Sequence, residues 1–247
     1  HMLAIISMSV CVFIVIMNFI SVVIMARKCK SRPRTLPVPR DAPAVSIIRP
    51  LRGVEQFSEE TLEASFSLNY PKYELVFCVQ SASDAVIDLV QATSRKHQHV
   101  DCTILIGDDV ISANPKLNNC VKGWDNAKYD YVILADSNAL MPPDYVQTML
   151  AAFNPETAMT VSMPIGSRPA NFWAVVECAI LNTFQARWQY GAEAIGIAFA
   201  QGKNMMWRKE VLDRAGGIRA VASDIAEDAA STKVIRSQGM DIHLVRS

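Results

Sequence analysis

The sequence lacks the residue patterns of several common kinds of site. Its six cysteines show no CxxC spacing and no grouping with histidine, which argues against structural zinc and against a disulfide framework. Neither GxGxxG nor GxxxxGKS/T occurs, so the phosphate-binding loops of dinucleotide-binding dehydrogenases and P-loop nucleotidases are absent. The four histidines support no Ser-His-Asp arrangement. The formal net charge is zero, so the chain has no overall electrostatic preference for nucleic acid.

Charge is also missing from a long stretch near the N-terminus. No charged side chain occurs from Leu3 to Ala26, and Asn18 is the only strongly polar residue there. As a helix this stretch would be about 36 Å long, enough to cross a hydrocarbon core of about 30 Å. A cleaved signal peptide has basic residues before its apolar core, whereas here they follow it. We therefore predict a transmembrane helix over residues 3–26, rather than a signal peptide or a buried helix.

A basic and proline-rich segment follows the apolar stretch. Residues 27–34 and Arg40 carry positive charge, no acidic residue precedes Asp41, and prolines recur between 33 and 43. Prolines favour a stiff, extended linker, and basic residues next to a membrane span favour its cytoplasmic side. We predict a linker over residues 27–43, a cytoplasmic domain over residues 44–247, and a single membrane pass in this chain.

The rest of the chain alternates between short apolar runs and helical patterns. The expected strands are 44–49, 73–79, 101–106 and 131–136, and the expected helices include 58–68 and 84–96. Pro50 is expected to end the first strand. Strands that alternate with helices predict an α/β fold with a mostly parallel sheet flanked by helices.

Residues 171–188 have a different character. They are rich in large apolar and aromatic side chains and contain few charges. This pattern fits a helix that lies in the membrane interface, where tryptophan is favoured. It fits equally well a core helix packed on the sheet, and the periodicity leaves both interpretations open.

Polar residues stand directly after two predicted strands. Asp136 ends the apolar run that begins at Tyr131, Asn138 follows two residues later, and Asp84 follows the second strand. The ligand crevice of an open parallel sheet lies at the carboxyl ends of its strands. Mg²⁺ often takes one or two protein oxygens and completes its shell with substrate phosphates. We therefore predict a metal–diphosphate site with Asp136 and Asn138 as metal ligands, and a capping or turn role is the alternative.

Two more motifs open predicted helices. Asn114-Pro-Lys116 places a lysine at a helix N-terminus, which suits a phosphate group or a uracil carbonyl. Glu227 and Asp228 begin a helix that is expected to run to about Gln238. Acidic residues also stabilise a helix N-terminus through its dipole. Each motif therefore has a structural interpretation beside the functional one.

Taken in order, these motifs resemble those of the ceramide glucosyltransferase family. The resemblance covers residues 44–247 and is carried by Pro50-Leu-Arg-Gly53, Asn69-Tyr-Pro-Lys-Tyr-Glu74, Phe77-Cys-Val-Gln80, Asn114-Pro-Lys116, Ala135-Asp-Ser137, residues 208–217 and Ile225-Ala-Glu-Asp228. It implies a membrane-anchored enzyme of the GT-A glycosyltransferase fold that uses a UDP-sugar with Mg²⁺ or Mn²⁺ and inverts the configuration at the sugar.

The resemblance also implies roles for single residues. Asp84 matches the family's first aspartate, near the nucleotide, Asp136 matches the aspartate of the DxD metal motif, and Asp228 matches the catalytic base. Glu227 is expected to orient that base or to contact the sugar. The residues expected at the donor are Pro50, Asp84, Asn114, Lys116 and Asp136.

The chain departs from the family pattern at two points. Asn138 stands where the DxD motif often has a second acid, and no (Q/R)xxRW motif follows Asp228. The second departure suggests that a C-terminal part, with further membrane spans, is missing from this chain.

We predict an inverting glycosyltransferase that moves a hexose, expected to be glucose, from a UDP-sugar to a membrane lipid such as ceramide. The alternatives are transfer to diacylglycerol or a hopanoid, a processive polysaccharide synthase, and an inactive membrane-tethered protein that binds nucleotide-sugars. The expected partners are the bilayer, the lipid acceptor and the UDP-sugar, and no nucleic acid is expected. The sequence leaves the sugar, the lipid and the oligomeric state open.

Overall fold

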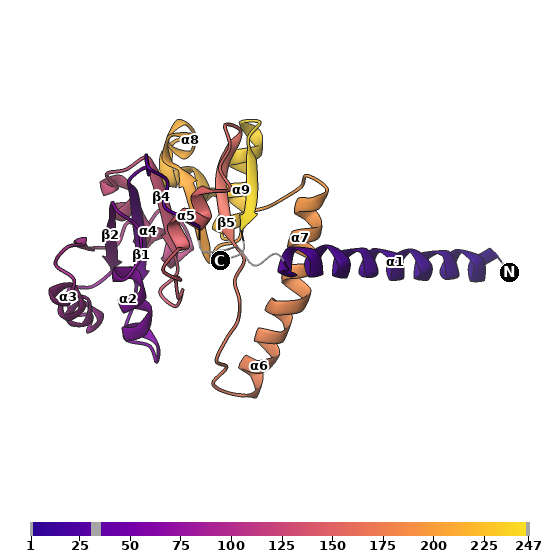
Figure 1. Ribbon diagram of the computed structural model, residues 1–247, viewed down its shortest axis with the longest axis horizontal. Coiled ribbons are helices and arrows are strands. Elements are labelled where there is room, and N and C mark those ends of the chain that lie inside the picture. The colour runs from indigo at the N-terminus through magenta and orange to yellow at the C-terminus, as the bar shows by residue number, and fades with distance from the viewer. Residues whose placement is uncertain (1, 31–35, 246–247) are drawn as a thin grey trace. The chain divides into compact units, whose positions relative to one another are not determined.

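The computed structural model describes residues 2–30 and 36–245, in two compact units. One unit comprises residues 2–30 and 164–198, and the other comprises 36–163 and 199–245. Figure 1 shows the elements of both units. Of the predicted linker, residues 27–30 continue the first helix and residues 31–35 lie outside the described residues.

The larger unit is built on a mixed sheet, in which the described residues form seven strands. These strands are β1 Val45–Leu51, β2 Tyr73–Val79, β3 Asp101–Ile106, β4 Tyr131–Ala135, β5 Thr157–Ser162, β6 Asn204–Arg208 and β7 Asp241–Val245. Their order in the sheet is β3-β2-β1-β4-β6-β5-β7. The first four strands pair in parallel, β6 is antiparallel to both β4 and β5, and β7 is parallel to β5. The predicted parallel arrangement is confirmed for β1 to β4.

Helices connect and flank these strands. They are α2 Ser58–Phe66, α3 Val86–Lys96, α4 Pro115–Asn126, α5 Tyr145–Leu150, α8 Lys209–Arg214, the 3₁₀ segment η2 Gly217–Ser223, and α9 Glu227–Ser237. β1 is buried along its whole length, as is β2 after its first residue. Strands covered on both faces are expected to be continuously apolar, which explains why these runs are recognisable in the sequence.

β1 continues through Pro50 instead of ending before it, so the prediction for this strand end is wrong. Pairing between β1 and β2 runs as far as Leu51 and Val79, whereas pairing between β1 and β4 ends at Ile48 and Leu134. At residue 50 the strand therefore has a paired neighbour on one side only. Proline, which has no N–H to donate, is tolerated in a strand where one side is unpaired.

α4 packs against the sheet most closely at Gly123. A Cβ atom at this position would lie 2.6 Å from Ile48 Cγ2 on β1 and 2.6 Å from Cys78 Sγ on β2. Both neighbours are fully buried. Glycine is therefore the residue that lets this helix approach the strands.

Gly123→Ala is expected to lower the free energy of unfolding by about 1–3 kcal/mol, because overpacking a core costs more than the roughly 1 kcal/mol that alanine gains in a helix. Denaturant unfolding of the intact protein would measure the change. The helical glycine Gly191 has no heavy atom within 4 Å of its built Cβ, so Gly191→Ala is the matched control and should not destabilise. Equal stabilities of the two variants would contradict the close packing at Gly123.

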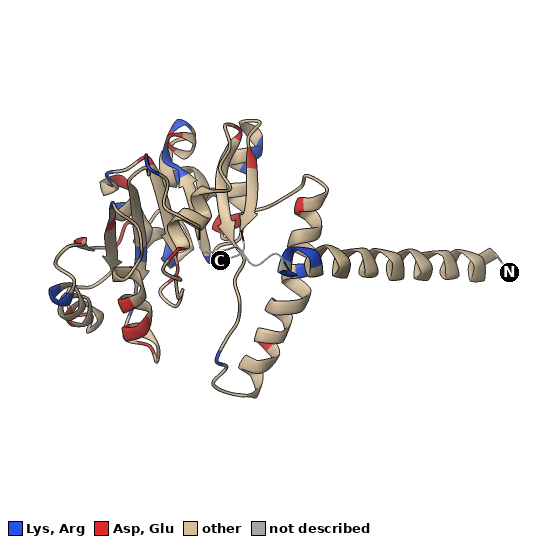
Figure 2. Cartoon of the chain, in the orientation of Figure 1, with Lys and Arg blue, Asp and Glu red and all other residues tan. Residues whose placement is uncertain are grey.

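The smaller unit consists of a long apolar helix and a second helical segment. α1 spans Met2–Lys30, and its stretch Met2–Lys28 is the described helix that is long and apolar enough to cross a membrane. The second segment comprises α6 Phe172–Ala179, the π-helical turn η1 Ile180–Gln185 and α7 Ala186–Ala194, which follow one another without a break. We call this segment the aromatic rod. Figure 2 shows α1 free of charge over most of its length, with basic residues at its C-terminal end.

Candidate active site

Lys116 joins two acidic side chains that are far away in the sequence. Its Nζ lies 2.6 Å from Asp136 Oδ1 and 2.8 Å from Glu227 Oε1, and it also donates a hydrogen bond to the carbonyl of Gly202. Asp136 directly follows β4, Lys116 lies in the first turn of α4, and Glu227 begins α9. The structure thus brings three of the residues singled out in the sequence to the carboxyl end of β4.

Asn114 completes this group, which we call the Lys116 cluster (Asn114, Lys116, Asp136 and Glu227). Its Oδ1 accepts hydrogen bonds from the backbone N–H groups of Lys116 and Leu117 at 3.0 and 3.3 Å, so it caps α4. Its Nδ2 donates to Glu227 Oε2 at 2.6 Å. The capping interpretation of the Asn114 motif is therefore correct, and the same side chain also holds Glu227 in the cluster.

The carboxylates of the cluster keep Lys116 charged. Burial lowers the pKa of Lys116, but the charges of Asp136 and Glu227 and their hydrogen bonds outweigh it and raise the pKa to about 12. The ammonium group is consequently a permanent cation at neutral pH. A permanent cation at the carboxyl end of a sheet is suited to bind an anionic group such as a phosphate.

The raised pKa predicts how the contribution of Lys116 to stability varies with pH. Because the folded pKa lies above the unfolded value, the contribution is fully present below about pH 10.5 and is lost as the pH rises through 12. Lys116→Met should therefore lower the free energy of unfolding equally at pH 7 and pH 9, and less at pH 11. Denaturant unfolding of both proteins at these pH values would measure this. A difference that disappears between pH 7 and pH 9 would contradict the assigned ion pairs.

Two neighbours of the cluster were not recognised from the sequence. Lys203 Nζ lies 3.4 Å from Asp136 Oδ2, and the backbone N–H of Asp136 donates to the Lys203 carbonyl at 3.0 Å. A Cβ atom at Gly202 would lie 2.9 Å from Glu227 Oε1, so glycine leaves room for that carboxylate. Both residues directly precede β6, and only the pairing of β6 with β4 places them beside Asp136.

Arg49 is buried beneath the segment that carries Asp136. Its acceptors are the backbone carbonyls of Thr61, Asp136, Ser137 and Ala139 and the hydroxyl of Ser65. Burial lowers the pKa of Arg49 to about 10, although the charge of Asp136 acts in the opposite direction. Arg49 therefore remains a cation at neutral pH. Its guanidinium ties the turn after β4 to α2 and so fixes the backbone that presents the Asp136 carboxylate.

Asp84 connects two loops at another point of the sheet edge. Its carboxylate accepts the backbone N–H of Gly53 at 3.1 and 2.9 Å and the N–H of Val86 at 3.0 Å. It therefore joins the loop after β1 to the start of α3. Pro50 lies buried in β1, close in sequence to this loop.

The side chains of Asp228 and Asn138 have no described contact with the side chains of the Lys116 cluster. Asp228 Oδ1 accepts the N–H of Ala229 at 2.8 Å, within the same helix, and the side chain of Asn138 is exposed. Across residues 36–245, no described contact joins Asp84, Asp228 or Asn138 to the Lys116 cluster. The roles expected for these residues at the donor and the base remain predictions.

The residues at β4 fit a divalent cation that is held mainly by a diphosphate. Within the described part of the chain, no three His, Cys, Asp or Glu side chains gather closely enough to hold a metal ion. Mg²⁺ sites in enzymes that bind phosphates often contain only one or two protein carboxylates. Asp136 supplies one carboxylate, and two ammonium groups already lie against it, which shows that positive charge is favoured there.

Known proteins resemble this chain in sequence. The model of glycosyl transferase family 21 matches residues 10–247. The chain belongs to this family. Ceramide glucosyltransferase 1 of Caenorhabditis elegans is 29% identical over 199 residues, which cover 80% of this family 21 chain and 43% of the relative. The ceramide glucosyltransferase of Komagataella phaffii is 42% identical over 112 residues, which cover 44% of the chain and 22% of the relative. The chain thus spans less than half the length of either relative.

Solved structures confirm the predicted GT-A fold. The mannosyltransferase PcManGT of Pyrobaculum calidifontis, in complex with GDP-Man and Mn²⁺, matches 94% of the family 21 chain and 68% of its own, with a TM-score of 0.60 and 19% identity. Glucosyl-3-phosphoglycerate synthase of Mycobacterium tuberculosis, in complex with Mn²⁺, UDP and phosphoglyceric acid, matches 83% of the chain and 68% of its own, with a TM-score of 0.52 and 13% identity. At these identities the likeness concerns the fold alone.

Proposed function

We propose that this family 21 chain contains the catalytic domain of a membrane-anchored glycosyltransferase that moves a hexose, expected to be glucose, from a UDP-sugar to a lipid such as ceramide. The observation that carries the proposal is the Lys116 cluster at the carboxyl end of β4, where Asp136 and Glu227 meet a charged lysine. The names of the relatives support a sphingolipid acceptor.

The diphosphate of the donor would bind at the cluster. Lys116 and Lys203, which both lie against Asp136, would offset the negative charge that grows on the leaving UDP. Asp136 and Asn138 would hold a divalent cation, Mg²⁺ or Mn²⁺, together with the diphosphate. When bound, such an ion supplies Lewis-acid stabilisation of the leaving group.

The acceptor would be activated from the start of α9. The hydroxyl oxygen of the lipid would attack the anomeric carbon of the sugar while Asp228 takes the hydroxyl proton. The bond between the sugar and UDP would break in the same step, and the configuration at the anomeric carbon would invert. Glu227, which precedes Asp228 and is held by Lys116 and Asn114, would contact the sugar or orient the base. Asp84 and Pro50 would lie near the nucleotide through the loop that Asp84 ties to Gly53.

The apolar helix would bring this chemistry to the lipid. α1 ends in Arg27, Lys28 and Lys30, and basic residues next to a span favour the cytoplasmic side. In this orientation the catalytic domain faces the inner surface of the membrane. The anchor confines the site to the plane in which the acceptor's hydroxyl group emerges, which raises the local concentration of the acceptor.

Membranes that contain the intact protein would test the proposal directly. They would be incubated with labelled UDP-glucose, UDP-galactose or UDP-N-acetylglucosamine and with ceramide, diacylglycerol or a hopanoid. We expect a labelled glycolipid, formed from UDP-glucose and ceramide. A labelled polymer would support a polysaccharide synthase instead, and binding of UDP-sugars without transfer to any lipid would support an inactive protein.

A further inference from the structure

The aromatic rod turns its large apolar side chains outward. None of the residues of α6 or η1 is buried, and the exposed apolar side chains of the rod are Phe172, Trp173, Val175, Ile180, Phe184 and Trp188. A core helix would bury such side chains, so their exposure favours the interface interpretation of residues 171–188. So many large apolar side chains exposed on a single helical segment are unusual for a surface that faces water.

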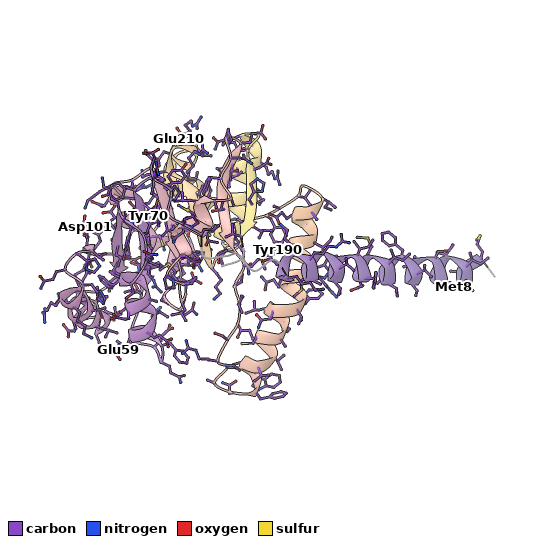
Figure 3. The ribbon with its side chains drawn as sticks, viewed as in Figure 1. Met8, Glu59, Tyr70, Asp101, Tyr190 and Glu210 are labelled. Atoms are coloured by element: carbon purple, nitrogen blue, oxygen red, sulfur yellow. The ribbon has the colours of Figure 1, made fainter. Side chains whose placement is uncertain are left out.

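The rod is attached to α1 at the end of its charge-free stretch. Lys28 Nζ lies 2.7 Å from Glu193 Oε2 of α7, and it lies 5.8 Å from the centre of the Tyr190 ring. Figure 1 shows the rod crossing the C-terminal end of α1 instead of running beside it. Figure 3 labels Tyr190 at this crossing and Met8 towards the other end of α1. If α1 spans a bilayer, the crossing therefore lies where the hydrocarbon core gives way to the head groups.

The side chains of the rod suit that level of a membrane. Tryptophan and arginine are amphipathic and are favoured in the head-group region, where an apolar body and a polar tip are both solvated. The Arg187 guanidinium lies 5.8 Å from the centre of the Phe184 ring and 5.5 Å from a ring centre of Trp188. Figure 2 shows few charged residues along the rod, so little charge would have to be desolvated.

We propose that the aromatic rod lies in the head-group interface of the bilayer as a second membrane contact, held at this depth by the attachment of Lys28 to Glu193 and Tyr190. The partner is the lipid surface, because the rod contacts α1, the described helix that is long and apolar enough to span it. The inference rests on the proposed insertion of α1, but it requires no sugar transfer.

The distribution of the four tryptophans allows a direct test. Trp124 and Trp207 are 1% and 0% exposed in the core of the larger unit, whereas Trp173 and Trp188 are 77% and 37% exposed on the rod. The intact protein would be reconstituted in phosphatidylcholine vesicles whose acyl chains carry bromine near the head group or near the chain end. We expect lipid bromine to quench the emission of the protein, more strongly from the shallow position.

The double variant Trp173→Phe and Trp188→Phe should lose this lipid-dependent quenching while the emission of the two core tryptophans remains. Quenching of the rod by aqueous iodide alone would overturn the proposal, because the face would then be in water. Protection from both quenchers would also overturn it, because a second copy or another protein would then cover the face. The measurement uses no donor sugar, so an inactive protein with a quenched rod refutes only the proposed function.

Discussion

Replacing Asp228 with asparagine is expected to lower the rate of lipid glycosylation by about 10²–10⁴-fold, the usual contribution of a general base. Asparagine has nearly the shape of aspartate but cannot accept the proton of the acceptor hydroxyl. Initial rates in membranes at saturating donor would measure the loss, and equilibrium binding of UDP should be unchanged. A variant that turned over normally would show that Asp228 is not the base.

The structure explains why catalysis and donor binding should separate at this position. The Asp228 carboxylate contacts the N–H of Ala229 in its own helix, whereas the Glu227 carboxylate contacts Lys116 and Asn114. Glu227→Gln would therefore disturb the donor site and weaken UDP binding, in contrast to Asp228→Asn. Asp88→Asn, which changes an exposed aspartate in α3, is the matched control and should leave both properties unchanged.

The parallel half of the fold was predictable because its strands are short runs in which apolar residues predominate. β2 and β3 begin and end at the predicted residues, and Asp136 directly follows β4 as expected. The second half of the sheet, from β5 to β7, was not predicted. β6 has the sequence Asn204-Met-Met-Trp-Arg208, which contains no β-branched residue and was therefore not recognised as a strand. Its antiparallel position beside β4 depends on tertiary pairing that no local pattern specifies.

The candidate site was also predictable only in part. Asn114, Lys116, Asp136 and Glu227 stand out because polar residues at strand ends and helix starts mark the ligand edge of a sheet. Lys203 was missed because its place follows from β6. Arg49 was missed because a charged residue near the end of an apolar run looks like a residue that reaches solvent. The signal in the sequence is that Arg49 interrupts β1, a strand in which every residue is buried.

Replacing Arg49 with methionine is expected to lower the free energy of unfolding by about 1–3 kcal/mol. The guanidinium donates to the carbonyls of Asp136, Ser137 and Ala139 at 3.0, 2.8 and 3.0 Å. Methionine would remove these hydrogen bonds. The Asp136 carbonyl would keep the N–H of Ala139 and the Ser137 carbonyl would keep the hydroxyl of Thr61, whereas the Ala139 carbonyl would lose the donor described for it. Each buried polar group that loses its partner costs about 1–3 kcal/mol. Denaturant unfolding would measure the loss, with Arg95→Met on the exposed surface of α3 as the matched control.

Arg49→Lys would show how much of the contribution of Arg49 to stability comes from its charge and how much from the shape of its guanidinium. Lysine keeps a positive charge under the turn after β4, but its ammonium cannot reproduce the planar fork that reaches both α2 and the carbonyls after Asp136. An intermediate stability is therefore expected, because the charge is retained and part of the hydrogen bonding is lost. If Arg49→Met were as stable as Arg95→Met, for which a change within about 0.5 kcal/mol is expected, the turn that carries Asp136 would not depend on Arg49.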